Sequence, residues 1–135
     1  MPLLVDAGVL YALVDKTDAW HERVVEYITS SRTALLAPVT VLPEVAYLVR
    51  SRLGVREELK LIAGFVEGGV TIEPLKDVDV SRAFAVMGRH PELGFTDSTI
   101  VAIAERLALA TIATTDRRHF RIARPRHVKQ FTLVP

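Results

Sequence analysis

Four acidic residues, far apart in the chain, carry most of the chemistry that this sequence could perform: Asp6, Glu44, Asp97 and Asp116. Carboxylates that converge repel one another and raise each other's pKa, and hard divalent cations relieve that repulsion. Ligation by oxygen alone selects Mg²⁺ or Mn²⁺ over Zn²⁺. Such ions activate water and stabilise the leaving oxygen in phosphodiester hydrolysis. If the four side chains meet in the fold, we therefore expect a Mg²⁺ or Mn²⁺ site with hydrolytic chemistry.

Each acid also has an ordinary structural explanation when it is taken alone. Asp6 follows a short apolar run and fits the N-cap of a helix, and Asp116 fits a turn after a strand. Glu44 falls about 40° outside the apolar arc of its helix, where surface side chains commonly snorkel. Asp97 is more informative, because it projects into the middle of an apolar arc. Thr96 is the expected cap of this helix, so Asp97 is not needed for capping. An inward carboxylate is costly without a compensating charge or metal, so the interpretation depends on the four acids together.

Short apolar runs alternate with amphipathic segments, and this alternation predicts the elements that must position the acids. Strands are predicted at residues 3–5, 34–37, 70–73, 111–114 and 130–134. Helices are predicted at residues 9–14, 19–30, 40–53, 55–66, 77–89 and 96–109. This order predicts an α/β fold with a mostly parallel sheet. Ligand sites in open α/β sheets lie beyond the carboxyl ends of the strands, where Asp6 and Asp116 both fall.

Composition narrows the class of protein. The chain has 135 residues, half of them hydrophobic, and no cysteine, which excludes disulfides, thiolate zinc sites and cysteine nucleophiles. No apolar run approaches the ~18 residues that cross a membrane. Residues 1–5 lack the basic and then apolar pattern of a signal peptide. We expect a single domain spanning residues 1–135, without a membrane segment and located in the cytoplasm.

Four motifs that occur in order along the chain resemble those of the PIN-domain nucleases, and within them those of the VapC toxins of toxin–antitoxin pairs. They are LVDAGVL at residues 4–10, PEV at 43–45, FTDS at 95–98 and TTDRRHF at 114–120. Each motif is short, but together they span nearly the whole chain. Their order and spacing make the resemblance fairly specific.

The resemblance implies a three-layer α/β/α sandwich around a mostly parallel sheet. It implies an endoribonuclease that depends on Mg²⁺ or Mn²⁺, with an acidic quartet formed by Asp6, Glu44, Asp97 and Asp116. Thr114 would help to orient the metal shell or a water. The resemblance further implies a homodimer inhibited by a cognate VapB-like antitoxin. Some relatives carry a further acid where this chain has His119, so the number of ions stays open.

Charged residues outside the quartet allow more than one interpretation. Residues 117–129 contain six basic side chains and no acid, whereas the rest of the chain is net acidic. This segment fits a polyanion, an acidic partner or a solvated loop. Arg117 and Arg118 could contact RNA phosphates or pair with nearby acids. The four histidines show no metal-ligand spacing, and we expect each to be structural or exposed: His21, His90, His119 and His127.

Two further functional classes compete with a nuclease. A catalytically inactive PIN-like module would bind RNA or a protein partner without turnover, although a complete acidic quartet argues against it. A phosphoacceptor signalling domain also has an acidic pocket on an α/β fold. It would need paired acids after the first strand, and here Val5 and Ala7 flank Asp6. A dinucleotide-binding enzyme is disfavoured because the chain has no G-x-G-x-x-G motif.

Overall fold

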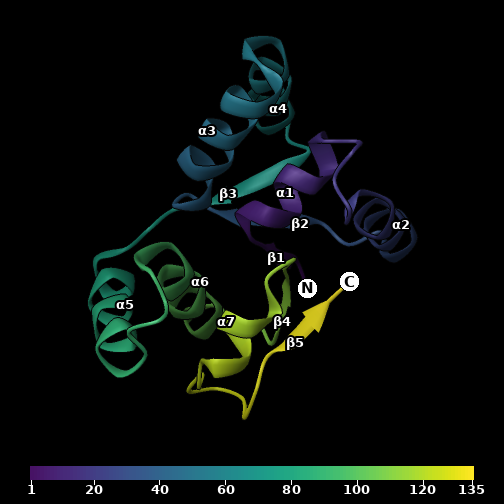
Figure 1. Cartoon of the computed structure of the whole chain (residues 1–135). Helices are drawn as coiled ribbons and strands as arrows, with labels where there is room; N and C mark the ends of the chain where they lie inside the picture. The colour runs from purple at the N-terminus through teal and green to yellow at the C-terminus, as the bar shows by residue number, and fades with distance from the viewer.

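A single five-stranded sheet forms the centre of the protein, seen here in a computed structural model that describes residues 1–135 (Figure 1). Its strands are β1 (Leu3–Val5), β2 (Leu35–Pro38), β3 (Val70–Glu73), β4 (Thr111–Ala113) and β5 (Thr132–Val134). They are arranged in the order β3-β2-β1-β4-β5, and every neighbouring pair is parallel. The prediction of a mostly parallel α/β sheet is confirmed.

Seven helices connect and cover the strands. They are α1 (Ala7–Val14), α2 (His21–Ser31), α3 (Val41–Leu53), α4 (Val55–Val66), α5 (Asp77–Arg89), α6 (Phe95–Arg106) and α7 (Arg117–Ile122). Gly54 separates α3 from α4 with a φ of 97°, a backbone conformation that side-chain-bearing residues rarely adopt. None of the seven helices has the length and apolar character needed to cross a bilayer.

The order of the strands divides the helices between the two faces of the sheet. The chain steps from β1 to β2 to β3 in one direction and then crosses to the other side of β1 to form β4 and β5. Because parallel crossovers are right-handed, this reversal places α1 to α4 on one face and α5 to α7 on the other. Figure 1 shows α5, α6 and α7 grouped apart from the first four helices. The expected three-layer α/β/α sandwich is confirmed.

The reversal also defines where a ligand should bind. β1 and β4 are neighbours, but their connections leave in opposite directions, so a crevice opens beyond their carboxyl ends. All three residues of β1 are buried, as expected for a parallel strand covered on both faces. The register pairs Leu4 with Ile112 and Val5 with Ala113, which brings the residues after each strand together.

Several sequence-based boundaries differ from the structure. Gly94 occupies the N-cap of α6, so the expectation that Thr96 caps this helix is wrong; Thr96 lies within the first turn. The helix ends at Arg106 rather than at residue 109. The short helix α7 was not predicted at all. The helix expected from residue 19 begins at His21, because Asp18 accepts a hydrogen bond from the Trp20 backbone just before it.

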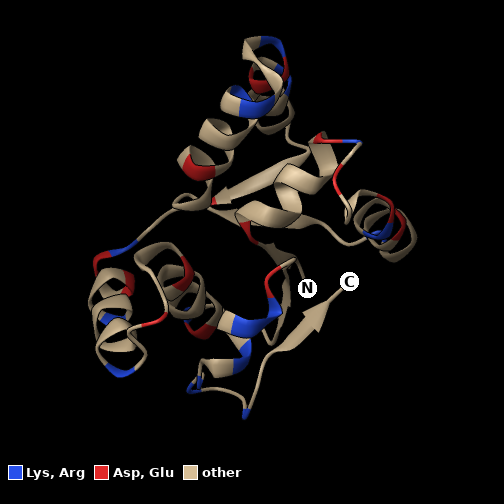
Figure 2. Ribbon diagram, in the orientation of Figure 1, with Lys and Arg blue, Asp and Glu red and all other residues tan.

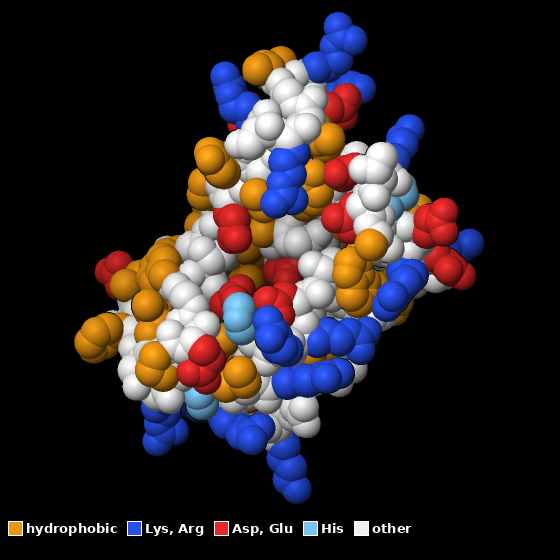
Figure 3. All heavy atoms as spheres, in the orientation of Figure 1, with side chains coloured by type: hydrophobic (Ala, Val, Ile, Leu, Met, Phe, Trp, Pro, Cys, Tyr) orange, Lys and Arg blue, Asp and Glu red, His pale blue; other side chains and the backbone are white.

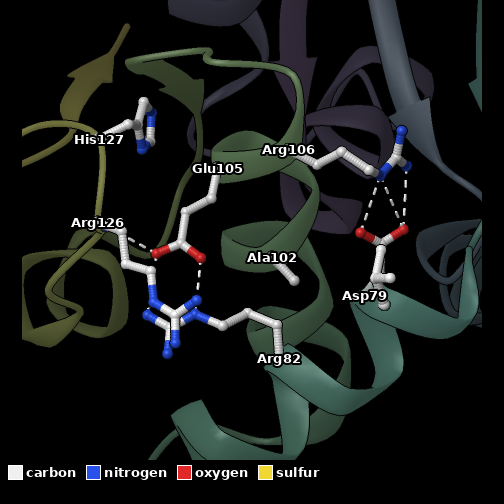
Figure 4. Close-up of a pocket in the computed structure, with 8 residues that line it drawn as sticks. Asp79, Arg82, Ala102, Glu105, Arg106, Arg126 and His127 are labelled. Carbon is white, nitrogen blue, oxygen red and sulfur yellow. Dashed lines mark hydrogen bonds and ion pairs between the residues drawn. The ribbon is translucent and has the colours of Figure 1, made fainter.

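Partly buried ion pairs join α5 to α6 (Figure 4). Arg82 contacts Glu105 at 2.7 and 3.0 Å, and the Arg106 guanidinium lies 2.9 Å from the buried Asp79. Burial alone would raise the pKa of Asp79, but hydrogen bonds from Arg106 and from the Lys76 backbone outweigh it and lower that pKa. These side chains line a cavity of about 360 Å³. Because its acids and most of its arginines already pair with one another, the cavity is best explained as part of the α5–α6 packing.

Candidate active site

Asp6 lies at the bottom of the crevice, directly after β1. Its Oδ1 accepts a hydrogen bond from the Val9 backbone at 2.9 Å, so it does cap α1, as one interpretation of the sequence expected. Its Oδ2 accepts a 2.5 Å hydrogen bond from the hydroxyl of Thr114. Asp6 is only 6% exposed. The same carboxyl thus starts a helix and is held in a fixed position in the crevice.

Thr114 and Asp116 come from the turn after β4. The Thr114 hydroxyl is fully buried and also accepts a hydrogen bond from the Asp116 backbone at 2.9 Å. Thr114 therefore fixes both the Asp6 carboxyl and the turn that carries Asp116. Gly8 allows the start of α1 to approach this turn, because a Cβ atom at Gly8 would lie 2.2 Å from the Thr115 hydroxyl oxygen.

Asp97 enters from the first turn of α6, which is anchored by the fully buried residues Ser98 to Ile100. Its Oδ2 lies 2.9 Å from Nδ1 of His119 on α7. The same nitrogen lies 3.2 Å from Oδ2 of Asp116. His119, which the sequence predicts to be structural or exposed, is therefore partly exposed and bridges two of the four acids.

All four predicted acids line one cavity of about 280 Å³ at the carboxyl ends of β1 and β4. Glu44, from the start of α3, is exposed but faces this cavity beside Leu48. Thr115 and His119 also line it, whereas Thr114 lies behind its wall. Figure 3 shows the acidic side chains in a hollow, next to a histidine and with basic side chains along one side. The geometric convergence on which the sequence interpretation depends is thus present.

The cavity makes it costly to ionise its acids. Burial raises the pKa of Asp6 to about 6, and the charges of Asp97 and Glu44 act in the same direction. Burial also raises the pKa of Asp97, as does the charge of Asp116, whereas His119 lowers it. For Glu44, burial and the charge of Asp97 both raise the pKa. The acids therefore destabilise one another at neutral pH, and a bound cation would relieve this.

The donor set fits a divalent cation. Carboxylate oxygens at the wall of one polar cavity are the ligands that Mg²⁺ and Mn²⁺ prefer. As the side chains are placed, no three of them surround a common point at ligand distance. The Asp6 oxygens face Val9 and Thr114, and Asp97 faces His119. The acidic side chains would need to rotate slightly before several of them could bind the same ion.

Basic residues occur on α7, directly after the acidic residue Asp116 that precedes this helix (Figure 2). Neither Arg117 nor Arg118 pairs with an acid, so the alternative in which they form local ion pairs is wrong. Arg117 donates a hydrogen bond to the Pro135 carbonyl, and its guanidinium lies 6.0 Å from the ring centre of Trp20. Arg23 lies 4.0 Å from the same ring centre. These cations therefore remain available to an anionic ligand.

Comparison with known proteins agrees with this architecture. The PIN domain family matches residues 3–125. The chain is 31% identical to Ribonuclease VapC26 of Mycobacterium tuberculosis, an alignment that covers 98% of this chain and all of the relative. The crystal structure of VapC20 from Mycobacterium tuberculosis, described as a sarcin–ricin loop cleaving toxin, superposes with a TM-score of 0.78. That match has 23% identity and covers 86% of this chain and 91% of VapC20.

A complex provides a further structural match. The DNA-bound VapBC structure from Salmonella typhimurium matches with a TM-score of 0.73 at 13% identity, covering 98% of this chain and 96% of that one. The parallel sheet, with an acidic crevice at its switch point, defines this protein as an α/β sandwich. The chain belongs to the PIN domain family.

Proposed function

We propose that residues 1–135 act as one PIN domain and form the ribonuclease toxin of a type II toxin–antitoxin pair. The observation that carries this proposal is the single cavity that collects Asp6, Glu44, Asp97 and Asp116 from four separate parts of the chain. The near full-length similarity to Ribonuclease VapC26 supports the same reaction class.

The reaction proposed is metal-dependent hydrolysis of an RNA phosphodiester bond. Asp6, Glu44, Asp97 and Asp116 would hold Mg²⁺ or Mn²⁺. When bound, the cation supplies positive charge that activates a water and stabilises the leaving oxygen. Thr114 does not reach the cavity, so its part is to hold the Asp6 carboxyl through the 2.5 Å hydrogen bond. A fixed carboxyl loses little freedom when the substrate binds, which favours catalysis.

The substrate proposed is RNA, bound through its phosphates by the basic segment at residues 117–129. Arg117 and Arg118 begin α7 directly after Asp116, so they lie next to the acidic cavity. Neither guanidinium pairs with an acid, and such free groups match the geometry of phosphate oxygens. Binding of this kind should weaken steeply as salt is raised.

The partner proposed is a VapB-like antitoxin. This rests on the fold shared with the toxin–antitoxin complex from Salmonella typhimurium. Expression of this chain alone should arrest growth, and co-expression of the antitoxin encoded beside it should restore growth. Continued arrest in the presence of that neighbour would argue against the pair.

A homodimer is also proposed. The outer face of α5 exposes Phe84 at 79% and Val80 at 42%, one turn apart. Exposed apolar patches of this kind commonly mark protein interfaces. Light scattering after gel filtration should give the mass of two chains. The variant Phe84→Asp should shift that mass to one chain, whereas Val66→Asp on the exposed end of α4 should not.

The decisive experiment measures cleavage of RNA with and without a chelator. The variants Asp6→Asn and Asp97→Asn should lose cleavage by at least about 1,000-fold while their circular dichroism is retained. Asp77→Asn, on the exposed start of α5, is the matched control and should cleave normally. A variant that cleaves RNA normally without Asp97 would falsify the proposal. RNA binding without turnover under any metal would instead favour the inactive binding module.

A further inference from the structure

His119 places a nitrogen donor inside the acidic cavity. Its Nδ1 lies 2.9 Å from Oδ2 of Asp97 and 3.2 Å from Oδ2 of Asp116. The ring is 31% exposed and lines the cavity wall. The premise of a purely oxygen donor set, on which the sequence-based expectation of Mg²⁺ or Mn²⁺ was founded, therefore does not describe this site.

The two distances from His119 Nδ1 to the carboxylate oxygens are close to those between neighbouring ligands of one metal ion. Around an octahedral ion with ligands at 2.0–2.1 Å, donor atoms on adjacent corners lie about 3.0 Å apart. The 2.9 Å distance from His119 Nδ1 to Asp97 is close to this value, and the 3.2 Å distance to Asp116 is slightly longer. As placed, the three side chains do not surround a common point, so small side-chain rotations would be needed to bring these donors to one ion.

The local fold restricts His119 to this position. The next residue, Phe120, is 1% exposed and packs in the core, which fixes the rotation of α7 about its axis. The turn before α7 is held by the hydrogen bond from the Asp116 backbone to Thr114. Asp116 and His119 are thus one helical turn apart on an anchored element, which is how proteins present ligands with little loss of freedom.

We propose that His119 is a ligand of the active-site metal through its imidazole nitrogen, and that it biases the site toward Mn²⁺ over Mg²⁺. This inference rests on the proposed function. Imidazole suits transition metals, whereas Mg²⁺ demands oxygen ligands and retains its waters. The competing role is that of a positioning residue, in which Nδ1 only donates a hydrogen bond to Asp97.

The experiment uses the whole chain and Mn²⁺ alone as the probe. Pulsed electron paramagnetic resonance of bound Mn²⁺ should show coupling to an imidazole ¹⁴N nucleus in the natural protein. This coupling should vanish in His119→Gln and persist in His90→Gln, a control on the end of α5 outside the cavity. Calorimetric titrations should show that His119→Asp lowers the ratio of Mn²⁺ to Mg²⁺ affinity by at least about tenfold.

The outcomes separate this inference from the proposed function. Mn²⁺ bound without ¹⁴N coupling, with an unchanged affinity ratio in His119→Asp, would show that His119 only positions Asp97 and would overturn the inference alone. RNA cleavage that persists in a chelator, or no binding of Mn²⁺ or Mg²⁺ by the natural protein, would overturn both. Circular dichroism of each variant verifies that it is folded, and His119→Asp provides a second variant should His119→Gln fail to fold.

Discussion

Replacing Asp6 with asparagine should stabilise the metal-free protein at neutral pH while removing its activity. Burial raises the pKa of Asp6 from 3.8 to about 6, so the folded state holds this proton more tightly than the unfolded state does. The natural protein therefore loses stability as the pH rises from about 4 through 6. Asparagine has nearly the same shape and cannot ionise, so the Asp6→Asn variant should not lose this stability as the pH rises.

The size of the effect follows from the shift in pKa. Each unit corresponds to 1.36 kcal/mol, so a rise from 3.8 to about 6 corresponds to about 3 kcal/mol once Asp6 is fully ionised. Well below pH 4 the carboxyl is protonated in both states, and the difference between the variants should approach zero. The asparagine oxygen can keep the hydrogen bond from the Val9 backbone, and the Thr114 hydroxyl can turn to accept from the amide.

Urea unfolding followed by circular dichroism, in a chelator at pH 4, 6 and 8, measures this effect. The advantage of Asp6→Asn should grow from about 0.5 kcal/mol at pH 4 to about 3 kcal/mol at pH 8. Glu67→Gln, an exposed acid beyond the end of α4, should stay within about 0.5 kcal/mol of the natural protein throughout. An advantage that does not change with pH, or an asparagine variant that is less stable at pH 8, would refute the reasoning.

Three further changes test other parts of the structure. Arg106→Met leaves Asp79 buried without its partner, and urea unfolding should show that the free energy of unfolding falls by about 3–5 kcal/mol. The control Arg89→Ala, on the exposed end of α5, should lower it by less than about 0.5 kcal/mol. Gly8→Ala would place a Cβ atom 2.2 Å from the Thr115 hydroxyl, and kinetics should show RNA cleavage reduced by up to about 100-fold with unchanged circular dichroism. Mg²⁺ at 100 times its Kd should raise the free energy of unfolding by about 2.7 kcal/mol, and most of this gain should be absent in Asp97→Asn.

The sheet and most helices could be predicted because their signals are local. The strand at Val70–Glu73 and the helix at Asp77–Arg89 have the bounds that the sequence predicted, since apolar periodicity and flanking prolines mark both. The first residue of α6 could not be predicted from the sequence. Thr96 has the side chain of a cap, but the chain turns from extended to helical at Gly94, with no side-chain hydrogen bond to indicate it.

The acidic quartet could be predicted from the sequence, but the presence of His119 beside it could not. Asp6 and Asp116 follow strands, and the parallel topology alone brings such residues together. The spacing between histidines carries no information about His119, because its partner Asp97 lies 22 residues earlier in the chain. The signal that could have revealed it is its position one turn after Asp116. This position can be recognised only if α7 is predicted as a helix, and its six residues are too few to show a clear apolar period.

The bond between Thr114 and Asp6 joins residues 108 positions apart. Contacts of such long range form late, because the entropy of closing the loop must first be overcome. During synthesis, the first strand and its carboxyl leave the ribosome long before their counterparts have been translated. A nascent fragment ending before β4 would hold only part of the acidic quartet. An RNA-cleaving protein built this way would stay inactive until nearly the whole polypeptide has emerged.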